Sequence, residues 1–137
     1  MHVLRHRPSV RFDLIAPAGF RILSALDRTA YEVRVDLWIT SGTDSHAAGA
    51  HPTGEAFDVS VKGFSAQQIA DVKASLERYL GPLFTVLYEV PQVPSDPTLR
   101  PLAYVNVKAT GSHFHIQRKK GTTYPPEPLA PPAPVVA

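Results

Sequence analysis

The chain has 137 residues, of which 44% are hydrophobic and 19% are charged, as is typical of one globular domain. Its 14 basic and 12 acidic residues give a net charge of +2, which is too small to indicate nucleic acid as the main partner. There is no cysteine, so disulfides and thiolate metal sites are excluded, and any metal must be held by His, Asp, Glu or backbone oxygen.

The N-terminal residues, MHVLRHRPSVRFD, lack the uninterrupted apolar core of a signal peptide. No later stretch reaches the ~18 apolar residues of a membrane span. We therefore expect a protein that is made in the cytoplasm and has no membrane span. Residues 1–18 contain Pro8 and Pro17 and predict an N-terminal arm or an edge strand instead of a long helix.

Apolar residues then recur at a helical spacing, which predicts a helix over about 19–31 with a buried face at Phe20, Leu23, Leu26 and Ala30.

Residues 32–41 alternate between apolar and polar side chains and predict a strand. The small, polar residues 41–54 predict an ordered loop across the end of that strand. A second strand, EAFDVSV, follows at 55–61.

Ser65 and Gln68 have the spacing of a capping box, and the apolar pattern behind them predicts a helix over 65–80. Gly81-Pro82 ends it. The sequence FTVLYEV predicts a strand over 84–90.

Residues 103–109 and 113–119 predict a hairpin around Thr110-Gly111-Ser112. Together the elements predict an α+β domain over residues 19–120, with an antiparallel or mixed sheet flanked by two helices. Residues 121–137 include six prolines and predict an extended tail. This tail is either a disordered end or a segment that joins the chain to a larger assembly.

Two segments carry side chains suited to a metal ion. In HPTGEAFD, His51 lies in the loop and Asp58 in the next strand, and Pro52 and Gly54 favour a turn that folds the loop back onto the strand. The strand neighbours of Asp58 are apolar and face the core, so Asp58 lies on the opposite face. A carboxylate in that position needs a compensating cation.

In SHFHIQ, His113 and His115 are two apart on a strand, so their side chains share one face and lie roughly 6–7 Å apart. One metal can take one of them as ligand, and the other then lies within reach of a metal-bound water or a substrate carbonyl. Two histidines and a carboxylate with an open fourth position make a catalytic zinc set. The alternative is packed or exposed histidines without metal.

HPTGEAFD resembles the H-x-x-G-x-A-x-D signature of zinc D-Ala-D-Ala carboxypeptidases and related endolysin peptidases. SHFHIQ is similar to the H-x-H motif of the wider group that includes lysostaphin and the hedgehog domain. The resemblance implies zinc ligands at His51, Asp58 and His115, with His113 acting on the water or steadying the oxyanion. It also implies the hedgehog/DD-peptidase-like α+β fold over about residues 20–118.

The chain departs from the family pattern in the loop before Asp58. Gly49 stands two residues before His51, where family members usually read S-x-H-x-x-G. Asp44 replaces the arginine of S-G-Y-R-S, which commonly helps to hold the substrate. Either another basic residue serves or substrate recognition differs. His46 is a candidate substrate contact in its place.

A further departure concerns the catalytic base. The glutamate of the family's E-x-x-H arrangement would fall on Ser112, so it is absent. Proton transfer is then left to His113, or to Glu89 or Glu55 if the fold brings one of them close.

The expected function is zinc-dependent hydrolysis of peptide bonds in bacterial peptidoglycan, as a carboxypeptidase or an endopeptidase of the endolysin kind. Zinc would lower the pKa of its bound water to about 7. The expected partner is cell-wall peptide, reached after lysis or from a phage particle. The alternative is a zinc-stabilised, non-catalytic structural or binding module, for example within a phage particle. A metal-dependent nuclease is disfavoured, because such sites usually contain more carboxylates.

Overall fold

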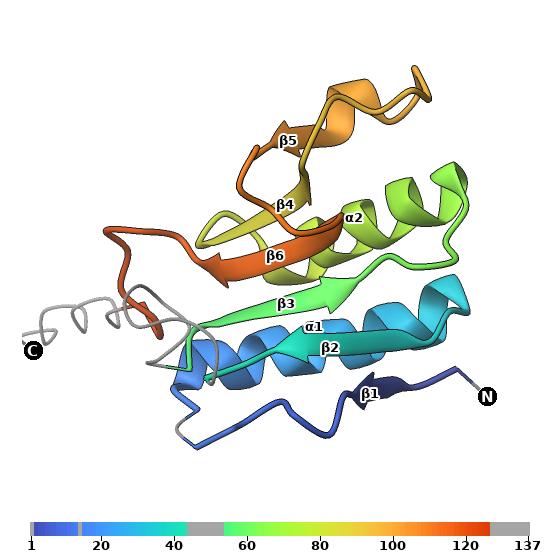
Figure 1. The fold of residues 1–137 in the computed structure, drawn as a ribbon. Helices are drawn as coiled ribbons and strands as arrows, with labels where there is room; N and C mark the ends of the chain where they lie inside the picture. Colours follow the sequence, from blue (N-terminus) through green and yellow to red (C-terminus); the bar gives the residue numbers. More distant parts are fainter. Residues whose placement is uncertain (1, 14, 44–53, 127–137) are drawn as a thin grey trace, which may run out of the picture.

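Within residues 2–13, 15–43 and 54–126, which the computed structural model describes, the chain folds into a mixed six-stranded sheet with two helices on one face (Figure 1). The strand order is β1-β2-β3-β6-β4-β5, and β1–β2 and β4–β5 are parallel while the other pairs are antiparallel. The predicted α+β class with a mixed sheet and two helices is confirmed. The elements are β1 (Leu4–His6), α1 (Pro17–Val33), β2 (Leu37–Ser41), β3 (Ala56–Ser60), α2 (Ala66–Leu80), β4 (Phe84–Val90), the 3-10 turn η1 (Arg100–Leu102), β5 (Ala103–Val105) and β6 (His113–Arg118).

Helix α1 is longer than its sequence pattern predicts. It starts at Pro17, whose missing N–H is harmless in the first turn, and runs to Val33. Arg34 ends it in a left-handed conformation with φ 62°. The strand predicted over 32–41 is therefore wrong in its first half, because β2 begins only at Leu37.

The buried face of α1 is also rotated from the predicted one. Phe20 is 61% exposed, whereas Ile22 and Ala25 are fully buried. Leu26 and Ala30 are buried as predicted. Gly19, in the first turn of α1, lies on the buried side, where its backbone closely approaches Gly54 before β3.

The hairpin predicted for residues 103–109 and 113–119 does not form. β5 pairs with β4 in parallel, whereas β6 lies between β3 and β4 and pairs antiparallel with both. Phe114 and Ile116 of β6 are fully buried, while the residues of β5 are exposed or half-buried. The apolar residues of β6 therefore place it at the centre of the sheet instead of beside the strand that precedes it.

β3 and α2 agree with the sequence pattern. Phe57 and Val59 are fully buried, which leaves Asp58 on the face of the sheet away from the helices. Ser65 caps α2: its hydroxyl accepts from the Gln68 N–H at 3.1 Å, and the Gln68 side-chain oxygen accepts from the Ser65 N–H at 2.9 Å.

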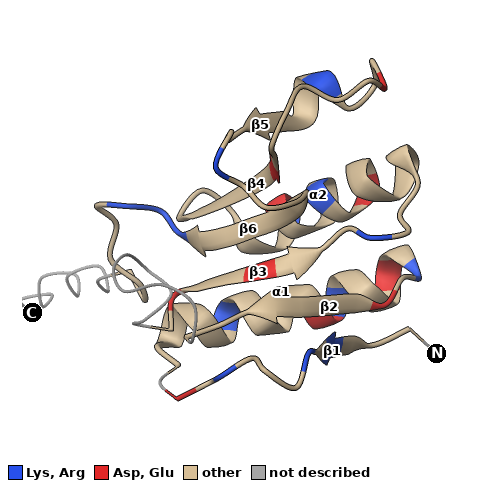
Figure 2. Ribbon diagram, in the orientation of Figure 1, with Lys and Arg blue, Asp and Glu red and all other residues tan. Residues whose placement is uncertain are grey.

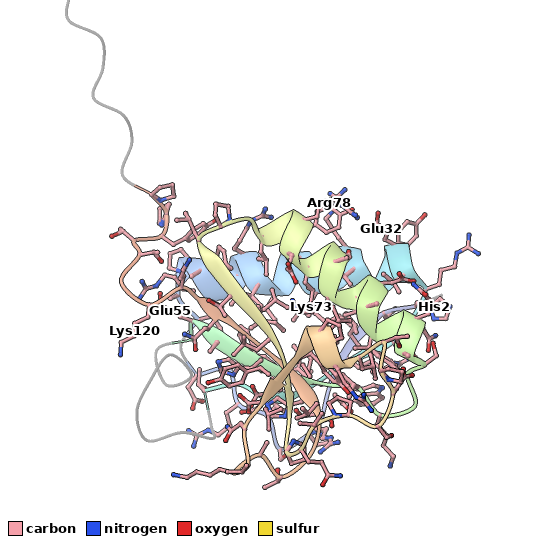
Figure 3. The ribbon with its side chains drawn as sticks, turned by 90° about the horizontal axis from the view of Figure 1, so that it is seen from above. His2, Glu32, Glu55, Lys73, Arg78 and Lys120 are labelled. Atoms are coloured by element: carbon pink, nitrogen blue, oxygen red, sulfur yellow. The ribbon has the colours of Figure 1, made fainter. Side chains whose placement is uncertain are left out.

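The two helices lie side by side over the sheet (Figure 3). A buried hydrogen bond of 2.8 Å joins the hydroxyls of Thr29 in α1 and Ser75 in α2. Glu32 accepts from the Ser75 hydroxyl at 3.1 Å and pairs with Arg78 at 2.6 Å. Neither described helix has the length and apolar character that crossing a membrane requires. The helices thus cover one face of the sheet. Among the described residues no helix lies over the other face, which we call the uncovered face.

Two glycines fix the chain at the end of β2 and the start of β3. A Cβ atom on Gly19 would lie 1.9 Å from the carbonyl oxygen of Gly54, and one on Gly42 would lie 2.4 Å from the carbonyl oxygen of Arg11. Both distances are far inside van der Waals contact. The backbones approach so closely at these points that glycine is required.

We predict that Gly19→Ala lowers the free energy of unfolding by about 1–3 kcal/mol through overpacking. In an unobstructed helix the same change would raise that free energy by up to about 1 kcal/mol. Urea denaturation measures the change. Gly111→Ala is the control, because a methyl group at that position would have no atom within 4 Å. A Gly19→Ala protein as stable as wild type would contradict the close approach.

Asp36 anchors β1 to the sheet edge. Its Oδ1 accepts a hydrogen bond from the Val3 N–H at 3.0 Å, and its Oδ2 lies 3.5 Å from Arg5 Nε. The hydrogen bond from the Val3 N–H has the largest effect on the pKa of Asp36 and lowers it. Burial acts in the opposite direction, and the charges of Arg5 and His2 lower this pKa further. The ionised carboxylate is therefore the form that stabilises the docked strand.

A carboxylate whose pKa is lowered by folding stabilises the fold at pH values above the ordinary aspartate pKa of about 3.9. This stabilisation is lost as the pH falls through the pKa of the folded state. We predict that Asp36→Asn lowers the melting temperature at pH 7 and that the difference from wild type disappears in strong acid. Thermal unfolding by circular dichroism between pH 7 and pH 2 tests this, with Asp27→Asn on the exposed side of α1 as control. A difference that stays constant with pH would exclude the anchoring role.

Candidate active site

The uncovered face of the sheet carries a polar cluster on three adjacent strands. Asp58 of β3 pairs with His115 of β6, and His113 of β6 pairs with Glu89 of β4. Figure 2 marks acidic residues on β3 and β4 in red in this region. The four side chains are 15% to 20% exposed, so the cluster is enclosed but open to solvent.

A β-bulge in β2 shapes one side of this cluster. Ile39 pairs with Val59 and Ser41 pairs with Asp58, so β2 has one residue more than β3 over this interval. Thr40 is the extra residue, and its hydroxyl donates to the carbonyl oxygen of Asp58 at 3.4 Å. Bulges bend a strand and redirect its side chains, and they are frequent beside functional sites.

His115 is held at both ring nitrogens. Nδ1 donates to Asp58 Oδ1 at 2.8 Å, and Nε2 donates to the Gln117 side-chain oxygen at 2.7 Å. Burial lowers the pKa of His115, but the bonds to Asp58 and Gln117 and the carboxylates of Asp58 and Glu89 outweigh it. The pKa of His115 therefore lies above its ordinary value. Without a metal, this site favours a positive charge next to Asp58.

His113 has one nitrogen fixed and one directed into the cluster. Nδ1 lies 3.1 Å from the carbonyl oxygen of Gly111, which can only accept, so Nδ1 carries a proton. Nε2 lies 3.2 Å from Glu89 Oε1 and 3.8 Å from Asp58 Oδ1. The backbone contact thus selects Nε2 as the nitrogen that exchanges protons.

Of the two glutamates considered as proton-transfer groups, the fold brings Glu89 to His113. Glu55 instead forms an ion pair with Arg118, and one of its oxygens lies 3.3 Å from Arg118 Nη2. Glu89 is therefore the glutamate that lies next to His113.

A pocket of about 460 Å³ opens beside His113 and Asp58. Its volume lies within the usual range for small-molecule sites, about 300–1,000 Å³. Its described lining residues are Arg7, Thr40, Ser41, Asp58, Ser60, Thr110, Gly111, Ser112 and His113. The cluster thus has space for a ligand directly beside it.

Asp58 and His115 fit two positions of a zinc site. Zinc ligands lie about 2.0–2.2 Å from the ion, so two ligating atoms lie within about 4 Å of each other, as these do. A metal-bound histidine commonly donates its other N–H to an acceptor, a role that Gln117 fits. Within residues 2–13, 15–43 and 54–126, no group of three or more His, Asp or Glu side chains is arranged to hold a metal ion.

His51 and His46 lie outside the described residues. The predicted ligand set of His51, Asp58 and His115 therefore stays a prediction, of which the structure places two members in contact. The predicted substrate contact of His46 is likewise untested.

No protein-family model matches the chain, and no curated protein or solved structure matches it. The resemblance to zinc peptidases therefore rests on the two motifs alone. The first motif ends at Asp58 in β3, the second begins at His113 in β6, and these strands are neighbours in the sheet.

Sequence reasoning missed Gln117 and gave Glu89 little weight. Gln117 could have been found, because it stands two residues after His115 on the same strand and so shares its face. Glu89 could not be assigned, because its contact depends on β4 pairing with β6.

We predict that wild-type protein binds one equivalent of zinc, and that Asp58→Asn and His115→Ala each weaken binding by more than about 100-fold. Loss of a residue that only supports a ligand already costs about 10–100-fold. Elemental analysis and competition with a chromogenic chelator measure this, with His2→Ala as control. Stoichiometric, tight zinc in either site variant would refute the assignment.

Proposed function

We propose that this chain is a zinc-dependent peptidase that hydrolyses peptide bonds of bacterial peptidoglycan. The observation that carries the proposal is the joint placement of Asp58, His113 and His115 on one uncovered sheet face beside a pocket. The proposed ligands are His51, Asp58 and His115. A hedgehog/DD-peptidase-like classification of the α+β fold is part of the proposal and is supported by the adjacency of the two motif strands.

Zinc, when bound, supplies a Lewis acid that acidifies water and polarises a peptide carbonyl. The donor set suits this ion, because zinc accepts imidazole nitrogen and carboxylate oxygen. Asp58 brings the negative charge that offsets the cation. Gln117 keeps the His115 ring in one orientation through the bond at Nε2. Three protein ligands would leave one position open, as hydrolysis requires.

His113 and Glu89 are the proposed proton-transfer pair. With Nδ1 bound to Gly111, Nε2 of His113 can take a proton from the attacking water and return it to the departing amine. Glu89, 3.2 Å away, stabilises the imidazolium that forms between these steps. The peptide C–N bond breaks, the water oxygen joins the carbonyl carbon, and the amine leaves with the proton.

The proposed partner is cell-wall peptide, met after lysis or from within a virion. The Pro-rich tail is a candidate attachment segment, but residues 127–137 lie outside the described residues. A zinc-stabilised structural or binding module remains the second candidate, favoured by Asp44 and Ser112 standing where the family has an arginine and a glutamate.

We predict that zinc-loaded wild type releases new amines from purified muropeptides and that His113→Gln slows this by about 10²–10⁴-fold, the usual size of acid–base catalysis. Glu89→Gln should have a smaller effect in the same direction. Mass spectrometry of the products identifies the cleaved bond. Both variants should keep stoichiometric zinc. Zinc-loaded wild type that cleaves no muropeptide would contradict the peptidase and favour the module.

A further inference from the structure

Strand β1 brings a cation to the pocket of the active site. Arg7 follows β1, and its N–H donates to the carbonyl oxygen of Ile39 at 3.1 Å, which continues the pairing with β2. Two residues earlier, Arg5 lies over the ring of Trp38 on the uncovered face, 5.7 Å from its centroid. Residues two apart on a strand share a face, so Arg7 emerges there as well and lines the pocket with Asp58.

Arg7 differs from the neighbouring arginines in its contacts. Arg5 pairs with Asp36 at 3.5 Å, and Arg11 pairs with Asp13 at 2.6 Å. For the part of the chain that the structure describes, the Arg7 guanidinium has no ion pair or side-chain hydrogen bond. Its five N–H donors are therefore available to a ligand in the pocket.

The other walls of the pocket suit a polar group. The described lining residues include five with hydroxyl groups: Thr40, Ser41, Ser60, Thr110 and Ser112. None of the described lining residues has a large apolar side chain. Arg7 is the one permanent positive charge among them, whereas Asp58 and nearby Glu89 disfavour anions.

We propose that Arg7 binds the terminal carboxylate of the substrate, so that the pocket takes the C-terminal residue. A guanidinium matches a planar carboxylate with two parallel hydrogen bonds. The main chain of an internal peptide segment has no charge to place there. This inference rests on the proposed function and makes the chain a carboxypeptidase, which releases one amino acid from the end of a peptide.

The test uses the whole chain, zinc-loaded and carrying His113→Gln, in which turnover is slow enough to measure binding. The ligands are an acetylated peptide ending in D-Ala-D-Ala and the same peptide as its C-terminal amide. The zinc-loaded His113→Gln protein is the parent. Calorimetry compares its affinity for each ligand with that of versions that also carry Arg7→Gln, Arg7→Lys or the control Arg5→Gln. Circular dichroism and zinc content verify that each variant is folded and loaded.

We predict that the parent binds the free acid roughly tenfold more tightly than the amide, the size of a charge-assisted hydrogen bond at a solvent-exposed site. Arg7→Gln should abolish this preference, Arg7→Lys should keep part of it, and Arg5→Gln should leave it intact. A parent without the preference, or an Arg7→Gln protein that keeps it, overturns the assignment.

The same ligands separate this inference from the peptidase proposal. If wild type cleaves both peptides equally and the parent binds them equally, the peptidase stands and the role of Arg7 is refuted. If wild type cleaves neither peptide nor muropeptides while the Arg7-dependent preference is present, the peptidase is refuted and the carboxylate site stands.

Discussion

The pairing of β3 with β6 is the constraint on which the rest of the structure depends. These strands bury four apolar side chains beneath the helices: Phe57, Val59, Phe114 and Ile116. A slip of one residue would turn this apolar set toward solvent, so burial of the core fixes the register. The same register places Asp58 opposite His115. Core packing on one face of the sheet thereby determines which polar side chains meet on the other face.

Features of the site that follow from local pattern could be predicted from the sequence, and those that follow from long-range pairing could not. Alternation within each strand is enough to place Asp58, His113 and His115 on polar faces. The partner of His113 depends on β4, which the local pattern could not distinguish from the strand just before β6. The end of α1 was missed because its left-handed residue is Arg34 instead of glycine. The position of Arg7 follows from a parallel strand pair that α1 connects, which no local pattern encodes.

The cluster combines fixed and exchangeable protons in a way that suits acid–base chemistry. Gly111 fixes one nitrogen of His113, and Gln117 fixes one nitrogen of His115, so each ring turns its other nitrogen to a carboxylate. His115 faces Asp58 and His113 faces Glu89. Two histidines with different partners can take different roles, one holding a metal ion and one moving a proton. The close approach at Gly42 fixes the chain just after Ser41, the residue that pairs with Asp58.

The proposed chemistry depends above all on one zinc ion, whose proposed ligands are His51 and, on the uncovered face of the sheet, Asp58 and His115. Anomalous diffraction at the zinc absorption edge from crystals of the zinc-loaded protein tests this binding most directly. We expect a single strong peak in contact with these three side chains and with one position left for solvent. A peak elsewhere, or a zinc-loaded crystal without a peak beside Asp58 and His115, would contradict it.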